Sequence, residues 1–159
     1  MTMTITTREA SPADIPAIAE LFDLYRQFYE QPRDLPLAQR FISDRLAQRE
    51  SVIIVAENEQ AEVLGFCQLY PTFCSVEAKP IYTLSDLFVL PPARKAGAGR
   101  MLLQAAEAKA AAEGKARMDL TTARTNARAQ SLYESVGWVR DDVFLAYNRR
   151  VTTAKSQLA

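Results

Sequence analysis

The sequence predicts a mixed α/β domain, of the α+β kind, built around one central sheet. Three observations lead to this expectation. Strand-like and helix-like segments follow one another along the chain, and a glycine-containing loop joins a strand to a helix near its middle. The chain has 159 residues, of which 48% are hydrophobic and 24% charged, as in an ordinary globular domain. We therefore expect one domain over residues 1–159.

Strand and helix signals alternate in the first half of the chain. The Thr-rich stretch 3–8 suggests a first strand, and the Ser11-Pro12 pair is typical of a helix start, with an apolar stripe that ends before Pro32. A second amphipathic helix follows over 37–49. The β-branched run 51–57 and the run 63–73 indicate a hairpin, in which Gly65 marks a bulge.

The second half continues with a strand at 81–90, a helix from Met101 to Ala112 and a strand at 116–122. A short helix is expected from Asn126 to Val136, with Gly137 as its C-terminal cap. Two closing strands, at 138–140 and 143–151, complete the predicted sheet.

The composition argues against several kinds of partner. Lysine plus arginine equals aspartate plus glutamate, at 19 each, so no excess charge points to nucleic acid or to an anionic membrane. No apolar run is long enough for a membrane span, and no leader peptide is recognised. With two cysteines and no histidine, we expect neither a zinc site nor a disulfide framework. A cytoplasmic protein without a metal is the expectation.

The loop between the 81–90 strand and the next helix predicts an anion site. Gly97 and Gly99 allow a tight turn whose N–H groups point out of the helix start, and Arg94, Lys95 and Arg100 add positive charge. A Walker loop would need Lys and Ser or Thr after Gly99, and a dinucleotide fingerprint would need a third glycine where Leu102 stands. A phosphate compound of another class is favoured, with a plain basic loop as the alternative.

Two segments together carry a resemblance to a known family. Residues 94–99 read Arg-Lys-Ala-Gly-Ala-Gly, and residues 126–138 read Asn-Ala-Arg-Ala-Gln-Ser-Leu-Tyr-Glu-Ser-Val-Gly-Trp. In this order and separation they resemble the GNAT superfamily of acetyl-CoA-dependent N-acetyltransferases, along essentially the whole chain. The resemblance implies a twisted, mostly antiparallel sheet of about seven strands, splayed like a V and flanked by about four helices.

The resemblance also implies acetyl-CoA as co-substrate and a set of residues that bind it. The main chain of Leu87 and Val89 would pair with the pantetheine arm, because the strands splay apart beside them. The resemblance also implies that Asn126, in the second motif, binds the co-substrate. The loop residues expected around the pyrophosphate are Arg94, Lys95, Ala96, Gly97, Ala98, Gly99 and Arg100.

Amide formation needs an acid for the departing thiolate and a base for the attacking ammonium. The resemblance gives the acid role to Tyr133, since a phenol with pKa near ~10 stays protonated at neutral pH. The chain has no histidine, so the base is a carboxylate or ordered water. Asp86 is the best-placed candidate, with Glu134 and Glu57 less specific. An acid fixed by structural contacts is the alternative for Asp86, and core packing the alternative for Tyr133.

The acceptor remains open at this stage: a small amine or amino acid, a polyamine, or a protein lysine or N-terminus. Tyr29, Glu30 and Ser85 are expected to border its pocket, although polyamine-acetylating relatives tend to carry an acid where Ser85 stands. We expect direct transfer in a ternary complex. The alternatives are a non-catalytic acyl-CoA sensor with the same fold and, remotely, another nucleotide-binding domain. The alternating run 143–147 could pair two copies as a homodimer.

Overall fold

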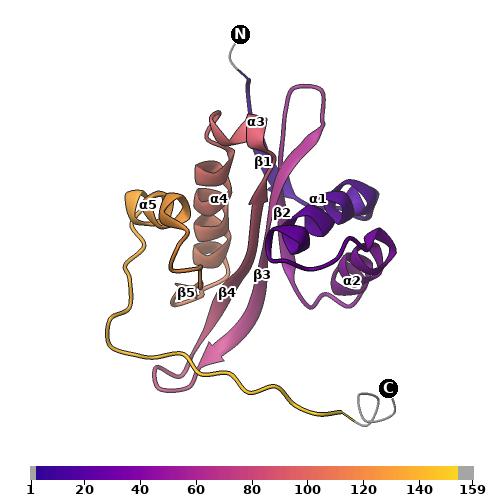
Figure 1. The fold of residues 1–159 in the computed structure, drawn as a ribbon. Coiled ribbons are helices and arrows are strands. Elements are labelled where there is room, and N and C mark those ends of the chain that lie inside the picture. The colour runs from indigo at the N-terminus through magenta and orange to yellow at the C-terminus, as the bar shows by residue number, and fades with distance from the viewer. Residues whose placement is uncertain (1–2, 154–159) are drawn as a thin grey trace.

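The computed structural model describes residues 3–153, and its centre is a five-stranded sheet (Figure 1). The strands lie in chain order and each pairs with the next. The first three pairings are antiparallel and the last is parallel. The strands are β1 (Thr6–Glu9), β2 (Val52–Glu57), β3 (Val63–Cys74), β4 (Lys79–Val89) and β5 (Met118–Asp119).

Helices cover both faces of this sheet (Figure 1). A short 3-10 turn, η1 (Pro12–Asp14), leads into α1 (Ile15–Phe28), which packs with α2 (Leu35–Ala47) on one face. The helix α4 (Ala98–Ala112) covers the opposite face, preceded by the single turn α3 (Pro91–Arg94). The last helix, α5 (Ala127–Ser135), lies beside α4. The helices and strands predicted up to Ala112 are thus confirmed, with ends shifted by a few residues, and α3 is an addition.

Two bulges interrupt the central strands. Leu64 has no partner between the pairs Ala56–Gly65 and Glu57–Val63, so the bulge predicted at Gly65 lies next to it. In β4, Ser85 is the extra residue between the pairs Gln68–Asp86 and Leu69–Leu84.

The bulge at Ser85 exchanges the two faces of β4, because one extra residue reverses the alternation of side chains. Before it, Leu84 packs into the apolar cluster under α4. After it, Phe88 packs into the cluster under α1, and Asp86 points to the same side. The bulge therefore places a carboxylate on the α1 face of the strand.

The strand β5 is shorter than predicted. Residues 116–122 were expected to form it, but only Met118 and Asp119 pair, with Tyr82 and Thr83 of β4. Beyond Thr83 the two chains diverge, so residues 120–122 have no ladder partner on β4. This divergence is the expected splay, and it shortens the strand because a strand needs a neighbour within hydrogen-bonding distance.

The two closing strands predicted at 138–140 and 143–151 are not formed, so the sheet has five strands instead of about seven. The Asp141 carboxylate accepts hydrogen bonds from the N–H groups of Val143 and Phe144, at 2.8 and 3.1 Å. A turn therefore stands where the second strand should begin. From there to residue 153 the chain crosses, in the view of Figure 1, the lower end of β3 and β4 and continues past the sheet. It has no strand partner among residues 3–153. No helix within this described range is long and apolar enough to cross a membrane.

Candidate active site

Two neighbouring clefts lie on the splayed side of β4. The larger has a volume of about 480 Å³ and the smaller about 330 Å³, and both are bordered by Tyr25 and Tyr29 of the α1 region. The larger is lined by the end of β4, the glycine loop and α5. Its remaining lining residues are Phe28, Leu87, Phe88, Val89, Arg94, Lys95, Gly97, Gly99, Arg100, Asn126, Arg128, Ala129, Leu132 and Tyr133.

The glycine loop supplies the larger cleft with hydrogen-bond donors. Gly97 caps α4 with φ of 83°, a left-handed conformation that favours glycine. The first three N–H groups of α4, from Ala98 to Arg100, have no acceptor within residues 3–153. Free N–H groups at a helix start bind anions, and the exposed Lys95 beside them adds charge. The predicted phosphate site is therefore geometrically available.

Close packing between α4 and α5 brings the two sequence motifs together. A Cβ atom on Gly99 would lie 3.1 Å from a methyl group of Leu132, so the helices approach closely at this glycine. The next residue, Arg100, donates a hydrogen bond of 3.0 Å to the hydroxyl of Ser135, which lies one turn after Leu132 on α5. The second motif thus lies against the first and closes one side of the cleft.

The open edge of β4 contributes backbone groups. The Leu90 N–H bonds to the Leu64 carbonyl on the β3 side, so the backbone groups of Val89 and Leu87 turn to the opposite, splayed side. The Val89 carbonyl there accepts a hydrogen bond of 2.7 Å from the Arg94 side chain. The N–H groups of Leu87 and Val89 face the splay, where β5 pairs only with Tyr82 and Thr83.

Tyr133 stands on α5 and lines the larger cleft. It is half-buried, with its ring 6.1 Å from that of Trp138. Burial raises the pKa of the Tyr133 phenol above its usual value, and the neighbouring Tyr29 adds to the shift. The Tyr133 phenol is therefore protonated at physiological pH.

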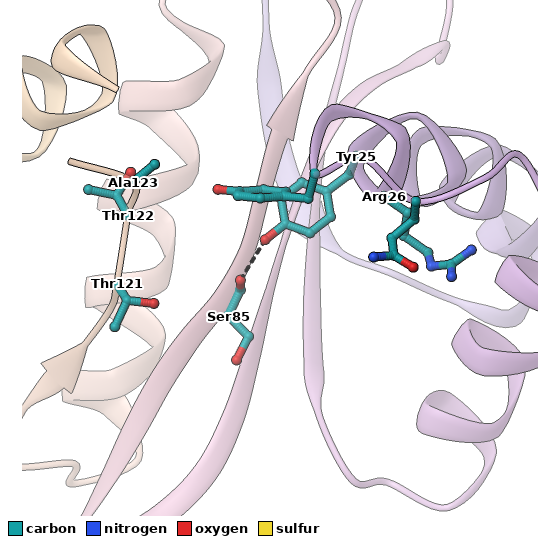
Figure 2. Close-up of a pocket in the computed structure, with 8 residues that line it drawn as sticks. Tyr25, Arg26, Ser85, Thr121, Thr122 and Ala123 are labelled. Carbon is teal, nitrogen blue, oxygen red and sulfur yellow. Dashed lines mark hydrogen bonds between the residues drawn. The ribbon is translucent and has the colours of Figure 1, made fainter. Parts of the chain in front are cut away.

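The smaller cleft opens between α1 and the chain that follows β5 (Figure 2). Tyr25 extends from α1 toward the strand, and its hydroxyl donates a hydrogen bond of 2.9 Å to the carbonyl of the bulged residue Ser85. Residues 121–123 form the opposite side. The smaller cleft is lined by Tyr25, Arg26, Tyr29, Gln31, Ser85, Thr121, Thr122 and Ala123.

Asp86 lies behind this cleft, in a buried polar chain. Its carboxylate, with 8% of the residue exposed, accepts a hydrogen bond from Gln68, whose amide oxygen accepts one from Ser51 at 2.7 Å. Burial raises the Asp86 pKa above its usual value, while hydrogen bonds from Gln68 and Tyr25 oppose this shift. Asp86 lines neither cleft, so the Tyr25 hydroxyl is its contact with the site.

The other predicted site residues divide between the clefts and the surface. Tyr29 borders both clefts, whereas Glu30 is exposed at the end of α1 and lines neither. The Asn126 side chain reaches the larger cleft but also caps α5, where it accepts the Ala129 N–H at 3.2 Å. Ala96 lies in the loop and Ala98 is the first residue of α4, and neither lines a cleft. Among residues 3–153, no cluster of His, Cys, Asp or Glu side chains could hold a metal ion.

Some lining residues were not predicted from the sequence. The sequence predicts a strand through Thr121 and Thr122 and assigns nothing to Ala123, yet all three residues form one side of the smaller cleft. The predicted splay could have indicated these residues, because the chain that follows β5 must face the open edge of β4, across from Ser85.

The chain matches known acetyltransferases in sequence and in structure. The family model described as "Acetyltransferase (GNAT) family" matches residues 18–138. An uncharacterised N-acetyltransferase of Bacillus subtilis, YhfO, is 49% identical over 88% of this chain and 93% of its own. The L-ornithine N5-acetyltransferase NATA1 of Arabidopsis thaliana is 27% identical over 83% of this chain and 50% of its own length.

Solved structures show the same fold. The crystal structure of a probable acetyltransferase superposes with a TM-score of 0.85 and 34% identity, covering 95% of this chain and 99% of its own. The ribosomal-protein-alanine N-acetyltransferase of Brucella melitensis superposes with a TM-score of 0.79 at 19% identity, covering 93% and 100%. At that identity the second likeness shows the fold alone.

Proposed function

Since this chain belongs to the GNAT family of acetyltransferases, we propose that it transfers the acetyl group of acetyl-CoA to a primary amine by direct attack in a ternary complex. The observation that supports this most is the meeting of two clefts at Tyr25 and Tyr29. One cleft holds an anion-binding helix start and a protonated phenol. The other reaches the same strand edge from the α1 side, where an acceptor can enter.

The glycine loop is the proposed binding site for the pyrophosphate of the co-substrate. The free N–H groups at residues 98–100 suit phosphate oxygens, with Lys95 and Arg128 near them. Arg94 is already bonded to the Val89 carbonyl, which orients its guanidinium along the cleft wall. Leu87 and Val89 offer N–H groups to the amide-bearing arm along the open edge of β4.

Two proton transfers accompany the reaction. Bound acetyl-CoA supplies an acetyl thioester, whose carbonyl carbon takes a new bond from the amine nitrogen as its bond to sulfur breaks. The Val89 N–H stabilises the negative oxygen that develops on this carbonyl. Tyr133 donates its proton to the departing thiolate. Asp86 is the final acceptor of the amine proton: the Tyr25 hydroxyl turns from the Ser85 carbonyl, gives its own proton to the carboxylate and takes that of the amine.

The acceptor is proposed to be a small-molecule or lysine-type amine. The smaller cleft has two tyrosines, which can hold a cationic amine over their faces. Among its lining residues there is no carboxylate, which does not favour a polyamine with several charges. The relative named for L-ornithine acetylation makes that amino acid a natural member of the substrate panel.

The test measures release of coenzyme A thiol from acetyl-CoA with amines, amino acids including L-ornithine, polyamines and a lysine peptide. We expect turnover with one class of amine, and Tyr133→Phe to lower kcat by roughly 10²-fold or more, the usual share of a general acid. The matched control is Tyr147→Phe, in a tyrosine that is 90% exposed and outside both clefts.

Calorimetric titration with acetyl-CoA separates the outcomes. Tight binding with no turnover of any amine would favour the acyl-CoA sensor over the enzyme. Equal rates for the Tyr133→Phe and Tyr147→Phe proteins would remove Tyr133 from the mechanism. Binding of ATP in competition with coenzyme A, or no acetyl-CoA binding at all, would contradict the assignment of the glycine loop.

A further inference from the structure

Gln68 of β3 is a fully buried amide in an apolar layer of the protein. Phe66, two residues earlier on the same strand, belongs to the apolar cluster under α1, so Gln68 shares that face of the sheet. Burying an amide costs free energy unless its polar atoms are hydrogen-bonded. An amide at this place therefore indicates a task that an apolar side chain cannot perform.

The register of the sheet places Gln68 between two polar side chains. In the ladder of β3 and β4, Gln68 lies directly opposite Asp86, and the bulge at Ser85 turns Asp86 to the same face. On its other side Gln68 pairs with Ile53 of β2, and Ser51 lies two residues before Ile53. The amide thus bridges the partly buried Ser51 and the buried carboxylate.

Both hydrogen bonds of this chain are donated toward Asp86. The Ser51 hydroxyl donates to Oε1 of Gln68 at 2.7 Å, and Nε2 of Gln68 donates to Oδ2 of Asp86. Consecutive donors that point at one acceptor polarise one another and favour a negative charge at the end of the chain. The arrangement therefore suits an ionised Asp86 better than a protonated one.

No other described side chain supplies this stabilisation. Within residues 3–153, no lysine or arginine forms an ion pair with Asp86. The titratable groups that interact with it are Tyr25 of α1 and two residues of β3, Cys67 and Tyr70. Burial raises the pKa of Cys67 and of Tyr70 to about 12, and that of Tyr25 above its usual value, so all three are neutral at pH 7. The Tyr25 hydroxyl donates to the Ser85 carbonyl.

We propose that Gln68, oriented by Ser51, is a positioning residue for acetyl transfer, because it holds the Asp86 carboxylate in the ionised form that can accept the amine proton. The proposal rests on the function proposed above, in which Asp86 is the final proton acceptor. Neither Gln68 nor Ser51 lines a cleft, so both act on the reaction only through Asp86. Their substitution should change the pH dependence of kcat and leave the affinity for acetyl-CoA unchanged.

The test combines kcat measured against pH with a carbon-13 NMR titration of the Asp86 carboxyl group, assigned by its absence in Asp86→Asn. Gln68→Met keeps the length of the side chain but removes the donor to the ionised form. It should raise the Asp86 pKa by about one pH unit, and the acidic limb of kcat should move up equally. On the acid side of the limb, kcat then falls about tenfold.

Ser51 supplies a milder pair of variants. Ser51→Ala should move the pKa and the limb in the same direction by less than Gln68→Met, because the donor to Asp86 remains. Ser51→Thr keeps the hydroxyl and should restore the parent's profile. The matched control is Ser75→Ala, at an exposed serine in the turn between β3 and β4 and outside both clefts. If Gln68→Met does not fold, the Ser51 variants decide.

The two measurements separate failure of this inference from failure of the proposed function. An Asp86 pKa that is the same in the parent, Gln68→Met and Ser51→Ala would overturn the inference, whatever the turnover. A carboxyl pKa that moves while the limb of kcat stays in place would remove both residues from the reaction. If the parent turns over no amine, the proposed function fails, and the NMR titration still decides whether Gln68 and Ser51 hold Asp86 ionised.

Discussion

At the scale of single residues, Asp86 is a buried carboxylate next to the site, and burying its charge lowers the stability of the fold. Only 8% of the residue is exposed, and its carboxylate accepts a hydrogen bond from Gln68, while the hydroxyl of the neighbouring Tyr25 donates to the Ser85 carbonyl. Burial disfavours the ionised form, which is why the Asp86 pKa lies above its usual value. A group held at such a cost within contact of the cleft is typical of functional sites.

The Asp86→Asn protein should therefore be more stable than the parent at pH 7 and slower in acetyl transfer. A raised pKa means that the unfolded chain loses this proton before the folded chain does, so the parent loses stability as pH rises above the ordinary value of 3.8. The Asn variant has no such loss. The difference between the two in urea unfolding should shrink as pH falls toward 4, and an Asn variant less stable at pH 7 would contradict this account.

Gly97 is constrained by its backbone conformation instead of by its contacts. Its φ is 83°, and no atom lies within 4 Å of the place where a Cβ would be. The cost of Gly97→Ala is thus conformational, about 1 kcal/mol of unfolding free energy. Gly97→Asn should cost less, because Asn tolerates this conformation. Urea denaturation measures both; equal losses for Ala and Asn would indicate a steric cause.

At the scale of elements, the site depends on where two helices begin. Both α4 and α5 present their N-terminal ends to the larger cleft, and Gly99 lets them approach at Leu132. Asn126 has two possible roles at this point. Its side chain accepts the Ala129 N–H as the cap of α5, and it also borders the cleft.

Substitution at Asn126 separates these two roles. Asn126→Ala removes the cap and should lower the unfolding free energy by about 1 kcal/mol. Asn126→Ser keeps a capping oxygen and should retain the parent's stability. If capping is the whole contribution, the Ser variant also keeps the parent's affinity for coenzyme A in calorimetry. A stable Ser variant with weakened affinity would show that Asn126 contacts the ligand directly.

The elements also show how far the sequence could predict the molecule. Periodicity and caps located α1, α2, α4 and α5, because each helix carries its own apolar stripe and end signals. The bulge at Ser85 could not be predicted, since nothing in residues 81–90 marks a register shift set by pairing with β3. Without it, Asp86 would be expected on the opposite face.

The prediction of two closing strands was wrong for a related reason. A strand-like sequence can pair with a neighbour but does not itself supply one. The run 143–147 is apolar and suited to a strand, but the described part of the chain offers it no partner. The site was predictable where it rests on local backbone, as at Gly97. It was not predictable where the splay brings Thr121 across from Ser85.

At the scale of the whole molecule, the distribution of charge matters more than its sum. Positive and negative side chains balance at 19 each, so the protein has no net field to attract an anionic ligand from a distance. The larger cleft nevertheless has four basic residues among those that line it: Arg94, Lys95, Arg100 and Arg128. Its positive potential is local, within reach of about one Debye length.

Binding of coenzyme A should therefore weaken with salt through these residues alone. Lys95 is exposed and makes no ion pair within residues 3–153, so Lys95→Gln should reduce the salt dependence of coenzyme A affinity without altering stability. Lys79→Gln, at the exposed start of β4 and outside both clefts, is the matched control. Calorimetric titrations at low and high salt measure the effect. Equal slopes for the two variants would mean that Lys95 does not act on the ligand, and the salt dependence would then come from Arg94, Arg100 and Arg128.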